Sequence, residues 1–368
     1  MLYNWQQEDW PKFTYDLSLV EDILYAFAEK GGSVGGLFSA LPEEMQDEAF
    51  LDLMVTEAMK TSEIEGEYLG REDIISSIRN TLGISHSFHD VKDKRAEGIG
   101  ELMVLITETY QEPLSEETLF VWHEMIMKGS RGVNKGQWRA HTEPMQVISG
   151  PVGREKIHFE APPSDRVPEE MAKFIKWFND TAPGGSREIT KPAVRSAVAH
   201  VYFESIHPFE DGNGRMGRAI SEKALSQGMG RSALLSLSGA IEAEKKAYYE
   251  AIMQAQRSNE ITPWIRYFAS AILDAQLRAE KQIMFILHKA RFFDRYKTQL
   301  SERQTQVIRK MLEAGPDGFE GGMNARKYIA ITRCSKATAT RDMQDLVEKG
   351  IFIPIGAGRN ARYELRLL

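Results

Sequence analysis

Residues 207–218 read His207-Pro-Phe-Glu-Asp-Gly-Asn-Gly-Arg-Met-Gly-Arg218, and they bring together several groups that phosphate chemistry requires. An imidazole exchanges a proton near neutral pH, so His207 is a candidate general base. The carboxylate of Asp211 offers the hard oxygen ligands that Mg²⁺ prefers. One short stretch therefore supplies both a base and a metal ligand.

The second half of the same stretch is suited to binding an anion. Gly212 and Gly214 carry no side chain on either side of Asn213, so the backbone N–H groups of this loop can turn toward a phosphate. Arg215 and Arg218 are spaced so that they share one face of a helix. If that helix begins at the loop, the positive end of its dipole adds to the attraction.

All twelve positions match the pattern His-Pro-Phe-x-Asp-Gly-Asn-Gly-Arg-x-x-Arg, whereas Asp-Gly-Asn-Gly alone would be an ordinary turn. The stretch resembles the signature of the Fic family, whose members mostly transfer AMP from ATP to hydroxyl groups of proteins. This resemblance implies a mainly α fold, with a Fic-type helical core and a β-hairpin flap. It also implies ATP as the substrate and Mg²⁺ as the cofactor.

The resemblance assigns a role to each residue of the motif. The catalytic base is His207, which takes the proton of a target Tyr, Thr or Ser hydroxyl, and the metal ligand is Asp211. The ATP and phosphate ligands are Gly212, Asn213, Gly214, Arg215 and Arg218. Positioning and electrostatic stabilisation would supply most of the rate.

A shorter motif, Thr61-Ser-Glu-Ile-Glu65-Gly66, ends a predicted amphipathic helix. Three carboxylates crowd this helix end, where the dipole disfavours negative charge, so the chemistry alone favours either a cationic partner or a solvated turn. The spacing Thr61-x-x-x-Glu65-Gly66 resembles the inhibitory motif of regulated Fic proteins. That resemblance implies that Glu65 pairs with Arg218 and blocks the γ-phosphate of ATP.

Two apolar–polar alternations, at 145–149 and 156–160, surround Gly150-Pro-Val-Gly153 and predict a β-hairpin. A lone hairpin is marginally stable, so it must lean on the rest of the fold. In the family, a hairpin at this place is a flap that binds the target segment as an added strand. The target-docking residues are then Val147, Ile148, Ile157 and His158.

A helix and turn are predicted over 245–264, and the family resemblance implies two nucleotide contacts there. Tyr249 would lie near the adenine, and Gln256 would read the edge of the base. The spacing to Gln256 is one residue longer than in many relatives. Packing of Tyr248 and Tyr249 on a helix face is the alternative for the tyrosines.

The remaining helical predictions concern the ends of the chain and its middle. Trp5, Trp10 and Phe13 are expected to hold the N-terminal segment on the core, and Gly31-Gly32 is expected to end the first helix. His123 is interpreted as a packing residue. Further helices are predicted at 92–110, 115–128 and 265–299. The loop residues His86, His89 and Asp90 are interpreted as surface, with metal binding as the alternative.

The length of 368 residues exceeds what one core usually holds. We expect an N-terminal helical extension with the inhibitory helix at 1–90, a Fic catalytic core at 91–275, a linker helix at 276–300 and a winged-helix domain at 301–368. The last segment holds 12 Lys+Arg and 8 Asp+Glu, whereas the whole chain has a net charge of −7. The acidic bulk argues against nucleic-acid binding by the main body.

The pattern after residue 300, a helix, a helix-turn-helix and a hairpin, resembles a winged-helix module. Its recognition helix would begin with Lys336, Thr338, Thr340 and Arg341, which implies docking of DNA or of a protein through residues 301–368. A nucleotide-responsive DNA-binding regulator is thus an alternative to the transferase. Removal of AMP in the same site, with Glu65 orienting a water, is another.

Composition indicates the setting in which the chain works. A single cysteine, Cys334, excludes an internal disulfide framework and favours a reducing, cytoplasmic compartment. The sequence has no signal-peptide pattern and no apolar run long enough for a membrane helix. The expected partners are ATP and an unidentified target protein, with self-modification included, and a homodimer is compatible with the sequence.

Overall fold

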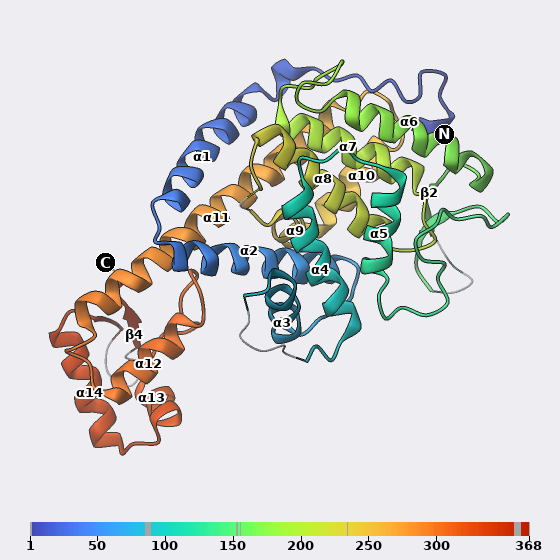
Figure 1. Ribbon diagram of the computed structural model, residues 1–368. Helices are drawn as coiled ribbons and strands as arrows, with labels where there is room; N and C mark the ends of the chain where they lie inside the picture. Colours follow the sequence, from blue (N-terminus) through green and yellow to red (C-terminus); the bar gives the residue numbers. More distant parts are fainter. Residues whose placement is uncertain are drawn as a thin grey trace. The chain divides into compact units, whose positions relative to one another are not determined.

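The computed structural model describes residues 2–84, 90–151, 154, 156–233, 235–356 and 362–367. The chain divides into two compact units, of which the first comprises Met1–Gly35 and Phe50–Ala279 and the second Gly36–Ala49 and Glu280–Leu368. Both are mainly helical, as predicted (Figure 1). His86 and His89 of the candidate metal loop lie outside the described residues, as do Val152 and Gly153 of the predicted hairpin turn.

The first unit contains most of the helices and one hairpin. Its elements are α3 (Arg71–Leu82), α4 (Lys94–Thr109), α5 (Glu116–Ile126), β1 (Gln146–Ser149), β2 (Lys156–Glu160), α6 (Val167–Asp180), α7 (Pro192–Ile206), α8 (Asn213–Met229), α9 (Leu237–Ala243) and α10 (Lys245–Ala255), with short 3₁₀ turns at Asn4–Gln6, Leu17–Leu19 and Ser164–Arg166. Three helices have residues in both units: α1 (Glu21–Ser39), α2 (Glu43–Ile64) and α11 (Thr262–Tyr296).

Helix α7 is the central element of the first unit, and it runs beside α8 (Figure 1). Every residue from Ala193 to Ile206 is buried, so this helix has no solvated face. Pro192 opens it, where a missing N–H costs no hydrogen bond. The polar side chains of α7 must therefore find partners inside the protein. Arg195, for example, donates to the carbonyls of Phe178 and Ala224.

The aromatic N-terminal segment packs on the first unit, which confirms the prediction. Trp5 donates its indole N–H to the carbonyl of Glu160, and Trp10 donates to the carboxylate of Glu170. Trp10 and Phe13 pack edge-on against Tyr202 of α7. The start of the chain thus contacts both the hairpin and the central helix.

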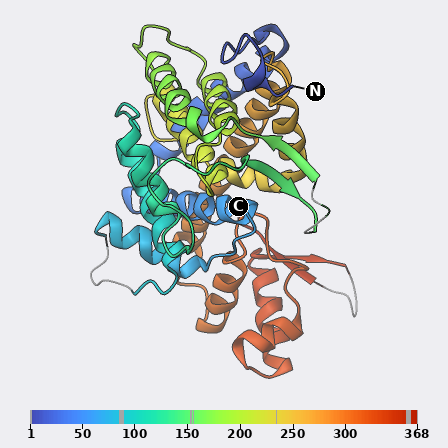
Figure 2. The same ribbon diagram turned by 90° about the vertical axis from the view of Figure 1, so that its right-hand side faces the viewer.

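The hairpin prediction is confirmed, and the prediction for Gly31-Gly32 is wrong. β1 and β2 pair in antiparallel fashion, and Figure 2 shows them as green arrows at the edge of the first unit. Helix α1 continues through both glycines to Ser39. A Cβ atom on Gly31 would lie 3.1 Å from the amide nitrogen of Gln276, and Arg231 donates to the Gly31 carbonyl. The glycine therefore permits close packing rather than ending the helix.

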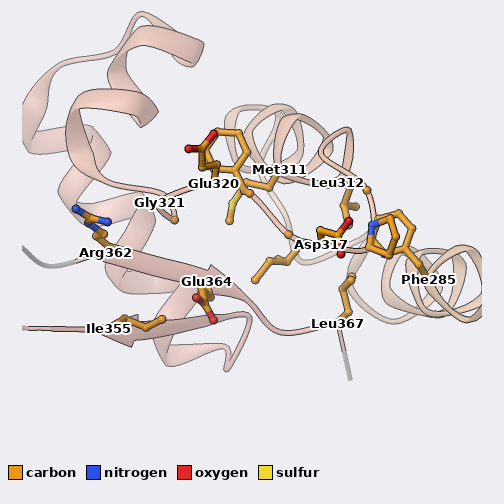
Figure 3. Close-up of a pocket in the computed structure, with 16 residues that line it drawn as sticks. Phe285, Met311, Leu312, Asp317, Glu320, Gly321, Ile355, Arg362, Glu364 and Leu367 are labelled. Atoms are coloured by element: carbon orange, nitrogen blue, oxygen red, sulfur yellow. The ribbon is translucent and has the colours of Figure 1, made fainter. Parts of the chain in front are cut away.

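The second unit has its own apolar core, built from α12 (Glu302–Leu312), α13 (Ala325–Thr332), α14 (Lys336–Glu348), β3 (Phe352–Ile355) and β4 (Arg362–Leu365). Ser301, Asn324 and Ser335 cap the three helices with their side-chain oxygens. A hollow of about 450 Å³ lies between the end of α12, the glycine-rich loop 315–322 and the hairpin β3–β4 (Figure 3).

A search of the described residues finds no helix that is long and apolar enough to cross a membrane.

A pH-dependent stability follows from His200 in the middle of α7. Its ring bonds the hydroxyls of Ser221 and Tyr248, and burial lowers its pKa from 6.5 to about 4. The folded protein disfavours the charged ring, so the stability contribution of His200 is complete above pH 6.5 and is lost as the pH falls toward 4. We expect this residue to account for on the order of 3 kcal/mol of the acid destabilisation.

The measurement is the free energy of unfolding in urea between pH 7 and pH 4. His200→Gln should flatten this part of the pH dependence, because glutamine does not titrate there. Ser196→Ala on the same helix removes a buried hydroxyl that donates to the carbonyl of Ser221 and carries no titratable group, so it is the control and should retain the wild-type slope. An unchanged slope in His200→Gln would contradict the assignment.

Candidate active site

The motif 207–218 forms the turn from α7 to α8 and one wall of a cavity of about 670 Å³. Other walls come from the hairpin, from α10 and from the end of α2, through Glu65. Of the residues predicted for the site, the lining includes Glu65, Val147, Ile148, His158, His207, Asp211, Gly212, Asn213, Gly214, Tyr249 and Gln256. Residues distant in sequence thus meet around one hollow.

His207 occupies an unusual backbone position at the end of α7. Its φ of 50° and ψ of 61° place it in the left-handed region, which is costly for a residue with a side chain. Its N–H donates to the carbonyl of Phe203, and its carbonyl accepts from the guanidinium of Arg139 at 2.8 Å. Hydrogen bonds at both the backbone N–H and the backbone carbonyl of His207 therefore fix its backbone, and this holds its imidazole at the cavity.

Arg139 is a positioning residue that the sequence analysis missed. Its buried guanidinium also donates to the carbonyls of Pro162 and Ile206 and to the hydroxyl of Ser164. Burial lowers its pKa to about 10, so it stays charged at neutral pH. The signal in the sequence was Gly136-Gln-Trp-Arg139, an arginine within an aromatic, irregular stretch.

The loop after His207 is fixed by the side chain of Asn213. Its carbonyl oxygen accepts from the backbone N–H of Phe209, and its amide nitrogen donates to the Phe209 carbonyl. The amide nitrogen carries two N–H groups and uses one here, so a phosphate contact from Asn213 could come from the second N–H or from the backbone N–H. Gly212 has a φ of 78°, and a Cβ there would lie 3.0 Å from the sulfur of Met127, so glycine fits this position best.

His123 supports the loop from α5, in agreement with its interpretation as a packing residue. Its ring stacks on Phe209 with centroids 3.9 Å apart. The N–H of Gly136 donates to Nδ1, so the ring proton is on Nε2, which faces the carbonyl of Asp211 at 3.1 Å. Burial lowers the pKa of His123, which favours this neutral tautomer.

Asp211 places an exposed carboxylate at the mouth of the loop, where one oxygen accepts from the N–H of Gly212. Among the residues with a described position, no group of three or more His, Cys, Asp or Glu side chains could hold a metal. A single carboxylate still fits Mg²⁺, because this ion is commonly held by one or two carboxylates together with substrate phosphates and water.

The three carboxylates at the end of α2 each pair with a cation. Glu63 bonds Lys60 within the helix at 2.6 Å. Glu65 accepts from Arg218 at 2.7 Å. The third, Glu67, accepts from the other motif arginine, Arg215, at 3.0 Å, a pair that the sequence analysis did not predict. The expectation of cationic partners is thus correct, and the solvated-turn alternative is wrong for all three.

The Arg218 site is almost completely buried. Thr61 accepts from Arg218 twice, through its hydroxyl at 2.7 Å and its carbonyl at 2.9 Å. Burial by itself disfavours the charged guanidinium, but Glu65, Tyr248 and Glu204 together outweigh it and the pKa of Arg218 is raised. A Cβ on Gly214 would lie 2.3 Å from the Glu65 carboxylate, so the end of α2 sits directly on the anion-binding loop. Gly66 ends this segment with a φ of 81°.

The hairpin presents an apolar pair to solvent beside the cavity. Ile148 and Ile157 are register partners and are 53% and 47% exposed. Ser149 and His158 form a side-chain hydrogen bond across the strands. Val147 pairs with the buried Phe159, which anchors the hairpin.

The two residues predicted near the base have partners of their own. Tyr249 is 36% exposed, and its hydroxyl lies 3.4 Å from the carbonyl of Ile64. Gln256 is buried, and its amide nitrogen donates to the carbonyl of Glu204. Tyr248 packs inward and bonds His200. Tyr248, Tyr249 and Gln256 all line the cavity, and Tyr248 also packs into the interior through its bond to His200.

Two family descriptions match this chain. Residues 113–225 match the Fic/DOC family, and residues 3–84 match a domain of unknown function, DUF4172. The first range contains the motif 207–218, and the second contains Thr61 to Glu67.

Curated relatives carry adenylyltransferase names. The protein adenylyltransferase Fic of Nematostella vectensis is 32% identical over 175 residues, which is 47% of this chain and 36% of that protein. A probable protein adenylyltransferase of Aquifex aeolicus is 27% identical over 183 residues, 47% of this chain and 52% of that protein. The matches thus span about half of these relatives or less.

Solved structures show the same fold at low identity. A Fic family protein from Desulfovibrio desulfuricans superposes with a TM-score of 0.54 and 20% identity, covering 97% of this chain and 98% of that one. A Fic domain containing signaling protein from Bacteroides thetaiotaomicron superposes with a TM-score of 0.53 and 17% identity, and the match covers 71% of this chain and 97% of that one.

Thr61→Val tests the buried contact between α2 and Arg218. Valine has nearly the shape of threonine, but it leaves a charged, buried N–H of Arg218 without an acceptor. We expect a loss of about 1–3 kcal/mol in the free energy of unfolding, measured in guanidinium chloride.

Thr56→Val is the matched control on the same helix. The Thr56 hydroxyl donates only to the carbonyl of Asp52 in its own helix, so this change should cost less than about 0.5 kcal/mol. Equal losses in the two variants would show that the Thr61–Arg218 bond contributes nothing specific.

Proposed function

Because this chain contains a Fic/DOC domain, we propose that it is a protein adenylyltransferase that transfers AMP from ATP to a hydroxyl group of a target protein. The observation that carries the proposal is the single cavity that joins His207, Asp211 and the loop 212–214, with Arg215 and Arg218 on the helix that follows. A base, a metal ligand and anion-binding groups converge there.

The proposed reaction is an in-line displacement at the α-phosphate. His207 takes the proton of a Tyr, Thr or Ser hydroxyl as its oxygen forms the new bond to the α-phosphorus. The bond to the β-phosphate oxygen breaks, and pyrophosphate leaves. Asp211 would hold Mg²⁺, which neutralises phosphate charge. The N–H groups of residues 212–214 and the two arginines stabilise the phosphate chain.

The hairpin β1–β2 is the proposed docking site for the target. A two-stranded hairpin leaves outer edges whose backbone groups can pair with an extended segment. β1 borders the cavity through Val147 and Ile148. A segment added there would pass its hydroxyl close to the base.

Glu65 is the proposed inhibitor of this transfer. Its ion pair with Arg218 occupies the guanidinium that a γ-phosphate needs, and its carboxylate adds negative charge beside the phosphate site. ATP that binds against this pair would be misaligned, and a small misplacement costs orders of magnitude in rate. The wild-type protein should therefore be weakly active.

The decisive experiment measures labelling of protein by α-labelled ATP and Mg²⁺, including self-modification. Glu65→Gly should raise transfer by about tenfold or more, because it frees Arg218 without altering the motif. His207→Ala in the same background should abolish transfer and retain ATP binding, since the base acts on the incoming hydroxyl.

Glu65→Gly/Arg218→Ala is the control for this assay, and it should lose the gain because the arginine is needed productively. Glu63→Gly removes a carboxylate of the same helix end that pairs with Lys60 of α2, and it should stay near wild type. If Glu65→Gly is no more active than wild type, the inhibitory role is wrong.

Removal of AMP is the alternative chemistry of the same cavity, because the Glu65 carboxylate lines it and could orient a water. Labelled protein freed of ATP distinguishes the two directions. Loss of label that requires Glu65 would support removal.

A specific observation also favours DNA binding by the second unit. Two acidic residues of α14 are paired internally, because Asp342 accepts from Arg303 and from the Tyr328 hydroxyl, and Asp345 accepts from Gln304. The third, Glu348, is exposed at the end of the helix. The exposed side chains of α14 include Lys336, Thr340, Arg341 and Gln344. These types contact phosphates and base edges.

Binding of the full-length chain to duplex DNA across a salt series tests this second function. Affinity should fall steeply with salt, and Lys336→Ala/Arg341→Ala should reduce the log–log slope by about 1–2. Lys310→Ala on α12, whose ammonium pairs with Glu313, is the control. Salt-independent or absent binding would contradict it.

A further inference from the structure

Glu204 is a buried carboxylate to which the proposed mechanism gives no role. It lies near the end of α7, three residues before His207, which follows the last residue of this helix in a left-handed conformation. It is only 7% exposed and lines the same cavity as the imidazole. Its Oε2 is 3.5 Å from Nδ1 of His207. A carboxylate thus stands behind the ring nitrogen.

Both groups have unsatisfied atoms. Nδ1 of His207 and Oε1 of Glu204 are buried without a hydrogen-bond partner among the described residues. Leaving such atoms unpaired is costly, and a proton on Nδ1 directed at Oε2 of the carboxylate would give Nδ1 a partner. The separation of 3.5 Å is slightly beyond a good hydrogen bond, and contacts of this kind often tighten when the substrate binds.

The surroundings hold the Glu204 carboxylate in place. A Cβ on Gly217 would lie 2.5 Å from Oε1, so the backbone of α8 passes directly over the carboxylate. The same Cβ would lie 3.2 Å from the ring of His200. Gln256 binds the Glu204 carbonyl from another side. The side chain has little room to turn away from His207.

The charges around Glu204 favour its ionised form. Burial would raise the pKa of this carboxyl, but His207, His200 and Arg218 together lower it. Tyr248 keeps its proton, because burial raises its pKa well above the usual value. His200 is neutral near pH 7, since burial lowers its pKa to about 4. The remaining groups that can stabilise the negative charge of Glu204 are His207 and Arg218. The guanidinium of Arg218 is already paired with Glu65.

We propose that Glu204 is a positioning residue: its ionised carboxylate holds His207 as the Nδ1–H tautomer, which leaves Nε2 free to accept the proton of the incoming hydroxyl. The proposal rests on the transferase function for its catalytic consequence. The tautomer itself does not depend on that function. A merely structural Glu204 would affect folding without setting the ring proton.

The test reads the tautomer by ¹⁵N NMR of protein labelled at histidine, with the His207 signals assigned by their loss in His207→Ala. Wild type should show Nδ1–H. Glu204→Gln should show a shift toward Nε2–H, because the amide can donate to Nδ1. Ser205→Ala, a buried neighbour whose hydroxyl bonds the carbonyl of Val201 and the side chain of Asn4, should keep the wild-type tautomer.

Activity gives the second readout, in the Glu65→Gly background. Glu204→Gln should lower kcat for AMP transfer on the order of a hundredfold and leave KM for ATP nearly unchanged, since the carboxylate acts through the base. The Ser205→Ala variant should transfer AMP like its parent. Circular dichroism checks that each variant is folded.

The outcomes separate the two proposals. If the Glu65→Gly parent does not transfer AMP, the proposed function fails, and the tautomer still decides the role of Glu204. If wild type shows Nε2–H, or if folded Glu204→Gln retains Nδ1–H, the positioning role is overturned even where transfer is observed.

Discussion

The site depends first on Arg139, because this guanidinium ties together segments that would otherwise diverge. The guanidinium donates to the carbonyls of Ile206 and His207 at the end of α7 and to the carbonyl of Pro162, just after the hairpin. The backbone N–H of Arg139 donates to the carbonyl of Pro208. A left-handed residue at the end of a helix is strained unless its surroundings determine it. Here the buried guanidinium of Arg139 has four acceptors, three carbonyls and the hydroxyl of Ser164, and these bonds fix the backbone around His207.

A second constraint is the complete burial of α7. A helix with no solvated face must satisfy its polar side chains internally, so Arg195 and His200 each bond a neighbouring helix. Glu204 differs, because its Oε1 has no hydrogen-bond partner among the described residues. The same requirement brings α8 close enough that Gly217 has no room for a side chain. The packing that stabilises the unit is therefore also the packing that surrounds the base.

Charge on the anion-binding face is balanced by the protein itself. Arg215 and Arg218 are nearly inaccessible to solvent, and an unpaired buried cation is expensive. Glu67 and Glu65, at the end of α2, form ion pairs with Arg215 and Arg218 and so offset the free-energy cost of burying these cations. Under the proposed function, a phosphate chain would compete with these carboxylates for the same guanidinium groups, which would couple nucleotide binding to the position of this segment.

Local sequence was sufficient for several of these features. The residues 207–218 predicted a helix–loop–helix turn with a base, a carboxylate and two arginines, because their chemistry and spacing are contained in one short segment. The alternation around 150 predicted the hairpin. For the crowded carboxylates near residue 65, the rule of charge left a cationic partner and a solvated turn open, and the pair of Glu65 with Arg218 followed from the family resemblance. The predictions of the turn and of the hairpin used interactions between near neighbours.

Only the tertiary structure decided the other contacts of the site, because these contacts depend on which segments, distant in the sequence, lie side by side. Arg215 finds Glu67 across 148 positions of sequence, and Arg139 finds the carbonyl of His207 across 68. Neither spacing carries a periodic signal. The amide of Asn213 is used within its own loop, and Gly31 lies inside a helix because Gln276 and Arg231 approach it. Glu204 is three residues before His207 in the sequence, but its burial under Gly217 places its carboxylate beside the imidazole of His207.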